Sequence, residues 1–161
     1  SDGSRIAVNR TRTRTPPGNG VVRTIAAGPS GALPAADVAR LLLNAQTVVE
    51  PWGTTAQVVS AANVLVPYSI TAYARTSPTV SGPAIQAAGL AAIQSFILNA
   101  PIGGFNSLGG DSGFIYSTEL AAIVSQASAD VFKADNATAD VVIGAEEVSV
   151  LGSGNISPSI V

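Results

Sequence analysis

The chain has 161 residues and a mass of 16.0 kDa, which is long enough to bury a core without disulfides or metals. It has no histidine and no cysteine, which excludes the usual neutral-pH general base, thiol nucleophiles and the commonest zinc ligands. Charged residues make up only 11% of the chain, against about 25% in an average soluble domain. Uncharged polar side chains and backbone must therefore form much of the surface, and such a surface is prone to association.

The net charge of −2 hides an uneven distribution. Residues 1–23 hold five arginines and one aspartate, whereas residues 111–161 hold seven acidic residues and one lysine. This asymmetry predicts attraction between the two regions, within one molecule or between neighbours. The sequence has no uninterrupted apolar run of the ~18 residues that a membrane span needs and no apolar signal-peptide core near its start. We expect a soluble protein or part of a soluble assembly.

Residues 1–20 are predicted to form an extended basic arm. Within it, residues 10–15 read Arg-Thr-Arg-Thr-Arg-Thr, and in an extended chain this alternation puts guanidiniums on one face and threonines on the other. A Pro-Pro-Gly-Asn-Gly stretch at 16–20 ends the pattern. The guanidinium face consists of Arg10, Arg12 and Arg14.

Residues 21–78 are predicted to form a first α+β lobe. A helix over 34–44 is indicated by a proline at its first position, an aspartate in its first turn and apolar residues at helical spacing. Apolar alternation predicts a strand over 64–75, and Pro67 within it indicates an open sheet edge. Shorter strands are expected at 21–26, 47–49 and 57–61.

Residues 79–161 are predicted to form a second α+β lobe. The clearest helix runs over 83–99 between flanking prolines and glycines, and a shorter helix begins at Ser117, its expected N-cap, with Glu119 in the first turn. Strands are expected at 131–134, 147–151 and 155–160. The full order, β-α-β-β-α-α-β-β, predicts an α+β fold with small, mostly antiparallel sheets and two to three helices packed on one face.

One motif has a catalytic counterpart, because Gly110-Asp111-Ser112-Gly113 matches the surroundings of the nucleophile in chymotrypsin-like proteases. That serine needs a histidine base, which this chain lacks. The one lysine, Lys133, lies in a predicted strand with nothing to position it as a base. We expect a Gly-rich turn at this motif.

Acidic and glycine-rich segments predict no metal or cofactor site. Glu146 and Glu147 are neighbours in a predicted strand and point to opposite faces, and residues 135–140 lack the spacing and central glycine of a calcium loop. The glycine pairs at 103–104 and 109–110 match neither a P-loop nor a dinucleotide fingerprint. We therefore assign no catalytic, cofactor-binding or metal-binding residue and expect the chain not to be an enzyme.

The Arg-Thr repeat is the strongest electrostatic feature. Its arginines, about 7 Å apart along a strand, could follow a nucleic acid backbone, but the few aromatic residues and the net acidity disfavour this. We predict instead that Arg10, Arg12 and Arg14 form a subunit interface with an acidic neighbour, while the threonine face adds a strand to an exposed edge. Trp52 and Tyr68 are expected in the core or at an interface.

The order and spacing of these segments resemble the C-terminal half of the baseplate J-like family, the baseplate wedge proteins of contractile-tailed bacteriophages. The most recognisable stretch is Val-Glu-Pro-Trp-Gly-Thr-Thr-Ala-Gln-Val-Val-Ser-Ala at 49–61, followed by Val-Pro-Tyr-Ser-Ile-Thr-Ala at 66–72. The Ala-rich helix over 83–99, Ile-Tyr-Ser at 115–117 and a late Val-x-x-Leu-Gly complete the order. The chain departs from the family's pattern at Glu50, where arginine is common, and at Trp52 and Gly53, where relatives have Leu-Thr.

This resemblance implies a non-enzymatic structural subunit that connects the central hub of the baseplate to peripheral tail components and the sheath. The implied partners are other wedge, hub and sheath proteins and copies of the chain in a symmetric assembly, with no cofactor and no membrane insertion. The implied location is the tail baseplate of the virion, after synthesis in the host cytoplasm. The missing initiator methionine and the missing N-terminal half of the family lead us to expect a fragment or a shortened homologue. The alternative is a non-catalytic binding or adhesin-like module of a surface assembly.

Overall fold

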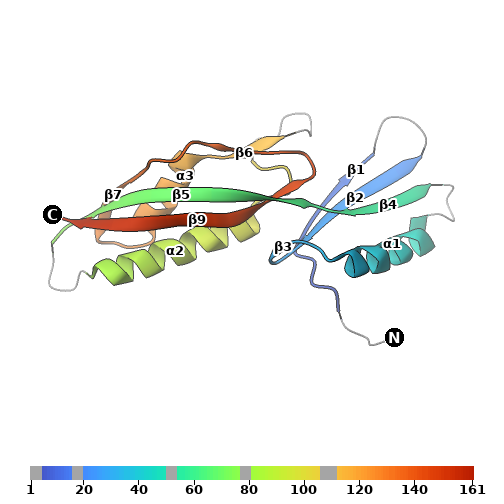
Figure 1. The fold of residues 1–161 in the computed structure, drawn as a ribbon, viewed down its shortest axis with the longest axis horizontal. Coiled ribbons are helices and arrows are strands. Elements are labelled where there is room, and N and C mark those ends of the chain that lie inside the picture. The colour runs from blue at the N-terminus through green and yellow to red at the C-terminus, as the bar shows by residue number, and fades with distance from the viewer. Residues whose placement is uncertain (1–4, 16–19, 50–53, 77–80, 106–111) are drawn as a thin grey trace.

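The computed structural model describes residues 5–15, 20–49, 54–76, 81–105 and 112–161. Two sheets with their helices follow one another along the long axis of the molecule (Figure 1). The described ranges contain three helices, and most of their strand pairs are antiparallel. The broad α+β class expected from the sequence is confirmed.

Sheet A lies at one end of the molecule and contains β1 (Arg10–Arg14), β2 (Val21–Gly28), β3 (Gly31–Ala32) and β4 (Thr55–Ser60). β1 and β3 are antiparallel to β2, whereas β4 is parallel to it. Helix α1 (Ala35–Val49) connects the parallel pair and packs against β4. The predicted strand at 47–49 is wrong because the helical pattern meets no proline or glycine before Pro51, so α1 continues to Val49.

Sheet B has the order β7–β5–β9, formed by β7 (Val131–Asn136), β5 (Ala62–Ala74) and β9 (Glu147–Ile160). β5 is antiparallel to β7 and parallel to β9. The helices α2 (Gly82–Asn99) and α3 (Ser117–Gln126) pack against this sheet and against each other. A two-stranded sheet of β6 (Gly113–Ile115) and β8 (Val141–Ile143) lies beside it.

The alternation predicted for the long central strand is confirmed in β5. Every even-numbered residue from Val66 to Ala74 is buried in the main core. Leu65 and Pro67, on the other face, are exposed. Pairing with β7 begins only at Ile70, and the pairing with β9 shifts register between Val66 and Tyr68. Pro67 therefore lies where one edge of β5 is open, as the sequence indicates.

The two sheets meet at Ala61, the one residue between β4 and β5. The expected boundary at residue 78 is therefore misplaced, because β5 pairs with strands from the 79–161 region rather than with sheet A. The expected separate arm over 1–20 is also revised, since β1 is a full strand of sheet A. A second core cluster, here called the junction core, joins the sheets and consists of Ile25, Ala27, Ala61, Ile102 and Val148.

The observed order contains more strands than the predicted one. β3, β6 and β8 were not expected, because each has only two or three residues and depends on a partner distant in sequence. The two strands expected at 147–151 and 155–160 form one continuous strand, β9. The N-cap of α3 is Tyr116 rather than Ser117, and the Ser117 N–H donates to Oδ1 of Asp140 at 2.7 Å.

Candidate subunit interface

The guanidinium face of β1 is turned toward the junction of the two sheets. Arg10 is buried and Arg12 and Arg14 are half-buried, whereas Thr11 and Thr13 are exposed. The predicted alternation is therefore confirmed. The residues of β2 that lie opposite the three arginines are Ala27, Ile25 and Arg23, so the guanidiniums share a face with the junction core.

Arg10 connects sheet A to the end of α2 and to β9. Its Nη1 donates to the carbonyl oxygens of Ile97 (3.1 Å) and Ser149 (3.2 Å), and its Nη2 donates to that of Gly28 (3.5 Å). Only 8% of Arg10 is exposed, and this burial lowers the pKa of its guanidinium because desolvation disfavours the charged form. The positive charge lies at the C-terminal end of α2, whose last turn has no basic residue, so it offsets the negative end of the helix dipole.

Arg12 makes a second set of contacts across the junction. Its Nη1 donates to the carbonyl oxygens of Ile102 (3.2 Å) and Ala145 (3.3 Å). The guanidinium occupies the space beside Gly103, where a Cβ would overlap Nη1. Gly103 has φ of +90°, a conformation that also favours glycine.

One ion pair joins the basic N-terminal region to the acidic C-terminal region. Nη2 of Arg23 donates to Oε2 of Glu146 at 2.6 Å, with about a third of each side chain exposed. Arg14 is also engaged in an interaction rather than free. Of the two alternatives for the charge asymmetry, attraction within one molecule is the one that this ion pair shows.

These contacts revise the role expected for the arginine face. Arg10 and Arg12 use their guanidiniums for carbonyl groups of their own chain, so they hold sheet A against sheet B instead of presenting charge to a neighbour. Arg23 and Glu146 belong to the same junction but were missed. Their signal in the sequence is the charge asymmetry between residues 1–23 and 111–161, which includes both residues but does not show that they pair.

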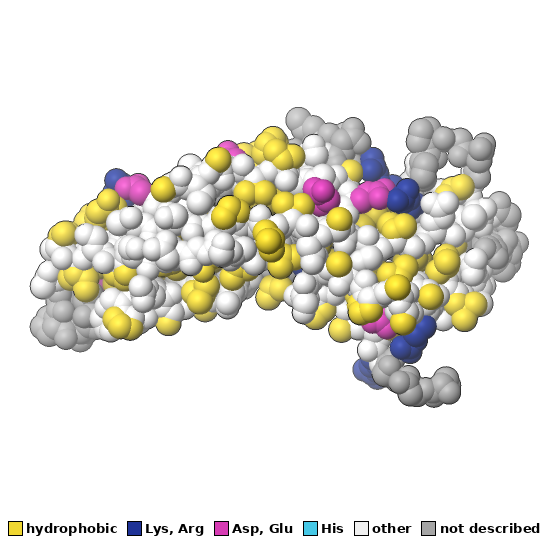
Figure 2. All heavy atoms as spheres, viewed as in Figure 1, with side chains coloured by type: hydrophobic (Ala, Val, Ile, Leu, Met, Phe, Trp, Pro, Cys, Tyr) yellow, Lys and Arg dark blue, Asp and Glu magenta, His cyan; other side chains and the backbone are white. Residues whose placement is uncertain are grey.

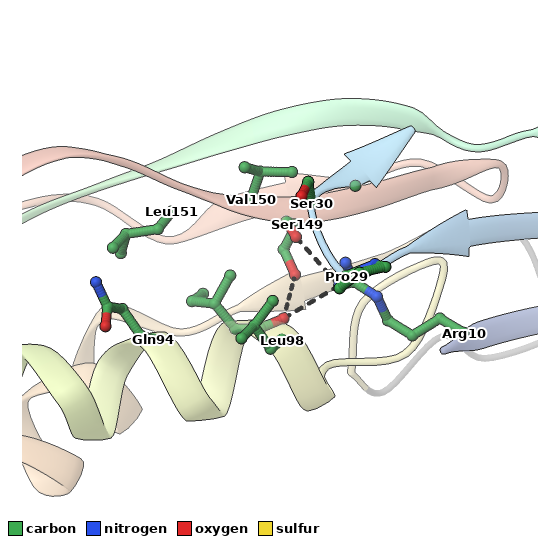
Figure 3. A pocket seen from close by; sticks show the side chains of 10 residues that line it. Arg10, Pro29, Ser30, Gln94, Leu98, Ser149, Val150 and Leu151 are labelled. Atoms are coloured by element: carbon green, nitrogen blue, oxygen red, sulfur yellow. Dashed lines mark hydrogen bonds between the residues drawn. The ribbon is translucent and has the colours of Figure 1, made fainter. Parts of the chain in front are cut away.

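A cavity of about 240 Å³ lies beside Arg10, between the turn after β2 and the end of α2 (Figure 3). Its walls are mainly apolar, with Ile97 and Leu98 on α2 and Val150 and Leu151 on β9. The Arg10 guanidinium is directed at backbone carbonyls, as the dashed lines in Figure 3 show. Among the described residues that line the cavity there is no carboxylate, so these residues form no acid–base pair.

The acidic residues considered as candidate ligands have separate structural roles. Glu147 accepts a hydrogen bond from the Gly144 N–H, Asp140 caps α3, and Asp135 pairs with Lys133 at 2.7 Å. Within the described ranges, no group of three or more Asp or Glu side chains comes together. Of the protease-like motif, Ser112 is exposed and Gly113 begins β6, while Gly110 and Asp111 lie outside the described residues.

The aromatic candidates have different outcomes. Tyr68 is a core residue, 8% exposed, which agrees with one of the two expected roles. Trp52 lies outside the described residues.

The outer strands of both sheets lack a further strand partner in the described ranges: β1 and β4 flank sheet A, and β7 and β9 flank sheet B. The edge of β9 is partly covered by its own chain, because its Glu147 carbonyl accepts from the Gly103 N–H and its Ser149 carbonyl from Arg10. Large apolar side chains are exposed at both ends of the molecule, and Figure 2 shows apolar side chains scattered over a surface with few charges. The most exposed on regular elements are Leu43, Val48, Leu65, Phe132 and Val142.

No protein-family model matches this chain, and a search of curated proteins gives no match. None of the helices in the described ranges is long and apolar enough to cross a membrane.

Proposed function

We propose that this chain is a structural subunit of a phage tail baseplate, of the wedge type that its motif order resembles, and that it acts through protein–protein contacts. In this role it connects the central hub to peripheral tail components and the sheath. The observation that carries the proposal is that the outer strands of both sheets have no further strand partner in the described ranges of an elongated molecule. An open edge presents unpaired N–H and C=O groups, which makes it a ready site for a strand from a neighbour.

The side-chain chemistry supports a contact role over a catalytic one. The buried charge of Arg10 is used to hold the two sheets together. Glu146, Glu147, Asp140 and Asp135 likewise have structural partners. Exposed apolar side chains occur on α1, on β7 and on β8, so both ends of the molecule offer surface that a neighbour could bury.

Immunogold electron microscopy tests this function. Particles are purified by density gradient from the lysate in which the chain is produced and labelled with antibody raised against the purified chain. Gold at the tail tip beside the tube is expected, and antibody preabsorbed with the chain gives the background. Unlabelled tails with the chain in the soluble fraction would contradict the proposal, and label on the cell surface would favour the adhesin-like alternative.

A further inference from the structure

The outer edge of β7 has a charge pattern that complements itself. Lys133 and Asp135 lie two residues apart on the exposed face of the strand, with side chains 59% and 51% exposed. The residue between them is Ala134. An antiparallel copy of β7 centred on Ala134 would place each Lys133 opposite the Asp135 of the other copy, since directly opposite residues share a face.

The backbone of β7 is arranged to accept such a strand. The Ala137 N–H donates to the carbonyl of Ser69 at 2.9 Å, so alternate residues Asp135 and Lys133 direct their backbone groups toward β5. Ala134 therefore directs its N–H and C=O outward. Two copies of Ala134 opposite each other would form a hydrogen-bonded pair at the centre of the ladder.

The surroundings of this edge leave room for a neighbour. A hollow of about 330 Å³ runs between β7 and α3, lined by small side chains that include Ala121, Ala122 and Ala134. Phe132 is 52% exposed at the other end of the strand. An added strand would cover part of its ring, which contributes apolar burial to the pairing.

The edge of β1 does not allow the same arrangement. In an antiparallel copy of β1 centred on Arg12, Arg12 lies opposite Arg12 and Arg10 opposite Arg14. Like charges directly opposite destabilise a strand pair. The charge pattern therefore selects β7 and disfavours β1 as the edge that pairs with itself.

We propose that two copies of this chain associate through their β7 strands, which pair antiparallel about a two-fold axis at Ala134. The two copies of sheet B then form one continuous six-stranded sheet. Each Lys133, which pairs with Asp135 of its own chain at 2.7 Å, then also faces Asp135 of the other copy, so the two pairs join into one charge network. A short ladder with exposed ion pairs gives a weak dimer that salt weakens further. This inference goes beyond the proposed function, because it concerns the purified chain wherever that chain is located.

Sedimentation velocity of the purified chain over a concentration series tests this pairing. The wild-type chain is expected to approach twice its mass of 16.0 kDa. Lys133→Glu and Asp135→Lys each put like charges opposite and should raise the dissociation constant about tenfold. The double variant Lys133→Glu, Asp135→Lys restores opposite charges and should return close to wild type. Arg40→Glu, the same charge change on α1, is the matched control and should leave the dimer unchanged.

A cysteine crosslink provides a second readout that does not depend on charge. The chain has no cysteine, so Ala134→Cys introduces the sole thiol, and two copies at the two-fold axis lie within disulfide distance. Mild oxidation should give a covalent dimer for Ala134→Cys and not for Thr13→Cys on β1. A chain that stays monomeric at its highest soluble concentration, or that crosslinks through Thr13→Cys instead, would overturn the proposal. Neither result would change where immunogold label falls on tails.

Discussion

Arg10 illustrates how far a sequence can predict a residue's role. The alternation of residues 10–15 predicts correctly that its guanidinium lies on one face with those of Arg12 and Arg14. It does not show what that face meets, because Ile97 and Ser149 are distant in sequence and the acceptors are backbone carbonyls, which every residue carries. The arginine repeat on a weakly charged chain therefore suggested an interface between subunits. In the structure, Arg10 and Arg12 instead donate to backbone carbonyls across the junction of the two sheets.

Replacing Arg10 tests its role at the junction. Arg10→Ala leaves the Ile97 and Ser149 carbonyls without their charged donor, and hydrogen bonds to charged groups contribute about 1.5–3 kcal/mol each. We expect the free energy of unfolding to fall by about 2–4 kcal/mol, measured by urea denaturation with far-ultraviolet circular dichroism. Arg5→Ala is the matched control because Arg5 is exposed, and it should change stability by less than about 0.5 kcal/mol. Equal effects of the two variants would contradict the junction role.

At the scale of elements, long periodic segments are predictable and short paired ones are not. The apolar patterns of α2, α3 and β5 identify those elements because each repeats over several turns or alternations. β6 and β8 have three residues each and exist through their pairing with each other. The parallel pairing of β5 with β9 is likewise not visible in either strand, since it depends on where the intervening helices pack.

The start of α3 gives a test at the same scale. Its first N–H, that of Ser117, is capped by Asp140 from a segment 23 residues away rather than by the Ser117 side chain. Asp140→Ala should lower the free energy of unfolding by about 0.5–2 kcal/mol, as expected for loss of a helix cap. Asp140→Asn keeps an oxygen acceptor and should cost less. If chemical denaturation shows no loss for Asp140→Ala, the cap does not stabilise the helix.

At the scale of the whole molecule, the junction core is expected to make the two sheets one cooperative unit. Ile25 and Ala27 come from sheet A, and Ile102 and Val148 from the second half of the chain. Together with the contacts of Arg10 and Arg12, this shared core opposes independent movement of the sheets. The sequence did not reveal it, because the predicted boundary at 78 separated β5 from its partners.

Cooperative unfolding is expected to be visible with two intrinsic probes. Trp52 lies in the sequence between α1 and β4, whereas all three tyrosines lie at or after residue 68. Tryptophan fluorescence and tyrosine near-ultraviolet dichroism should therefore give the same urea midpoint. Val148→Ala should lower both midpoints together, with a loss of about 1–3 kcal/mol. Two separate transitions in the wild-type chain would show that the sheets unfold independently.

The most direct test of the proposed structural role is cryo-electron microscopy of the purified particle at a resolution that traces side chains. We predict copies of this chain arranged around the tail tube at the tip, with neighbouring proteins or further copies packed on the outer strands of sheet A or sheet B. A complete tail reconstruction in which every density belongs to other chains would contradict it.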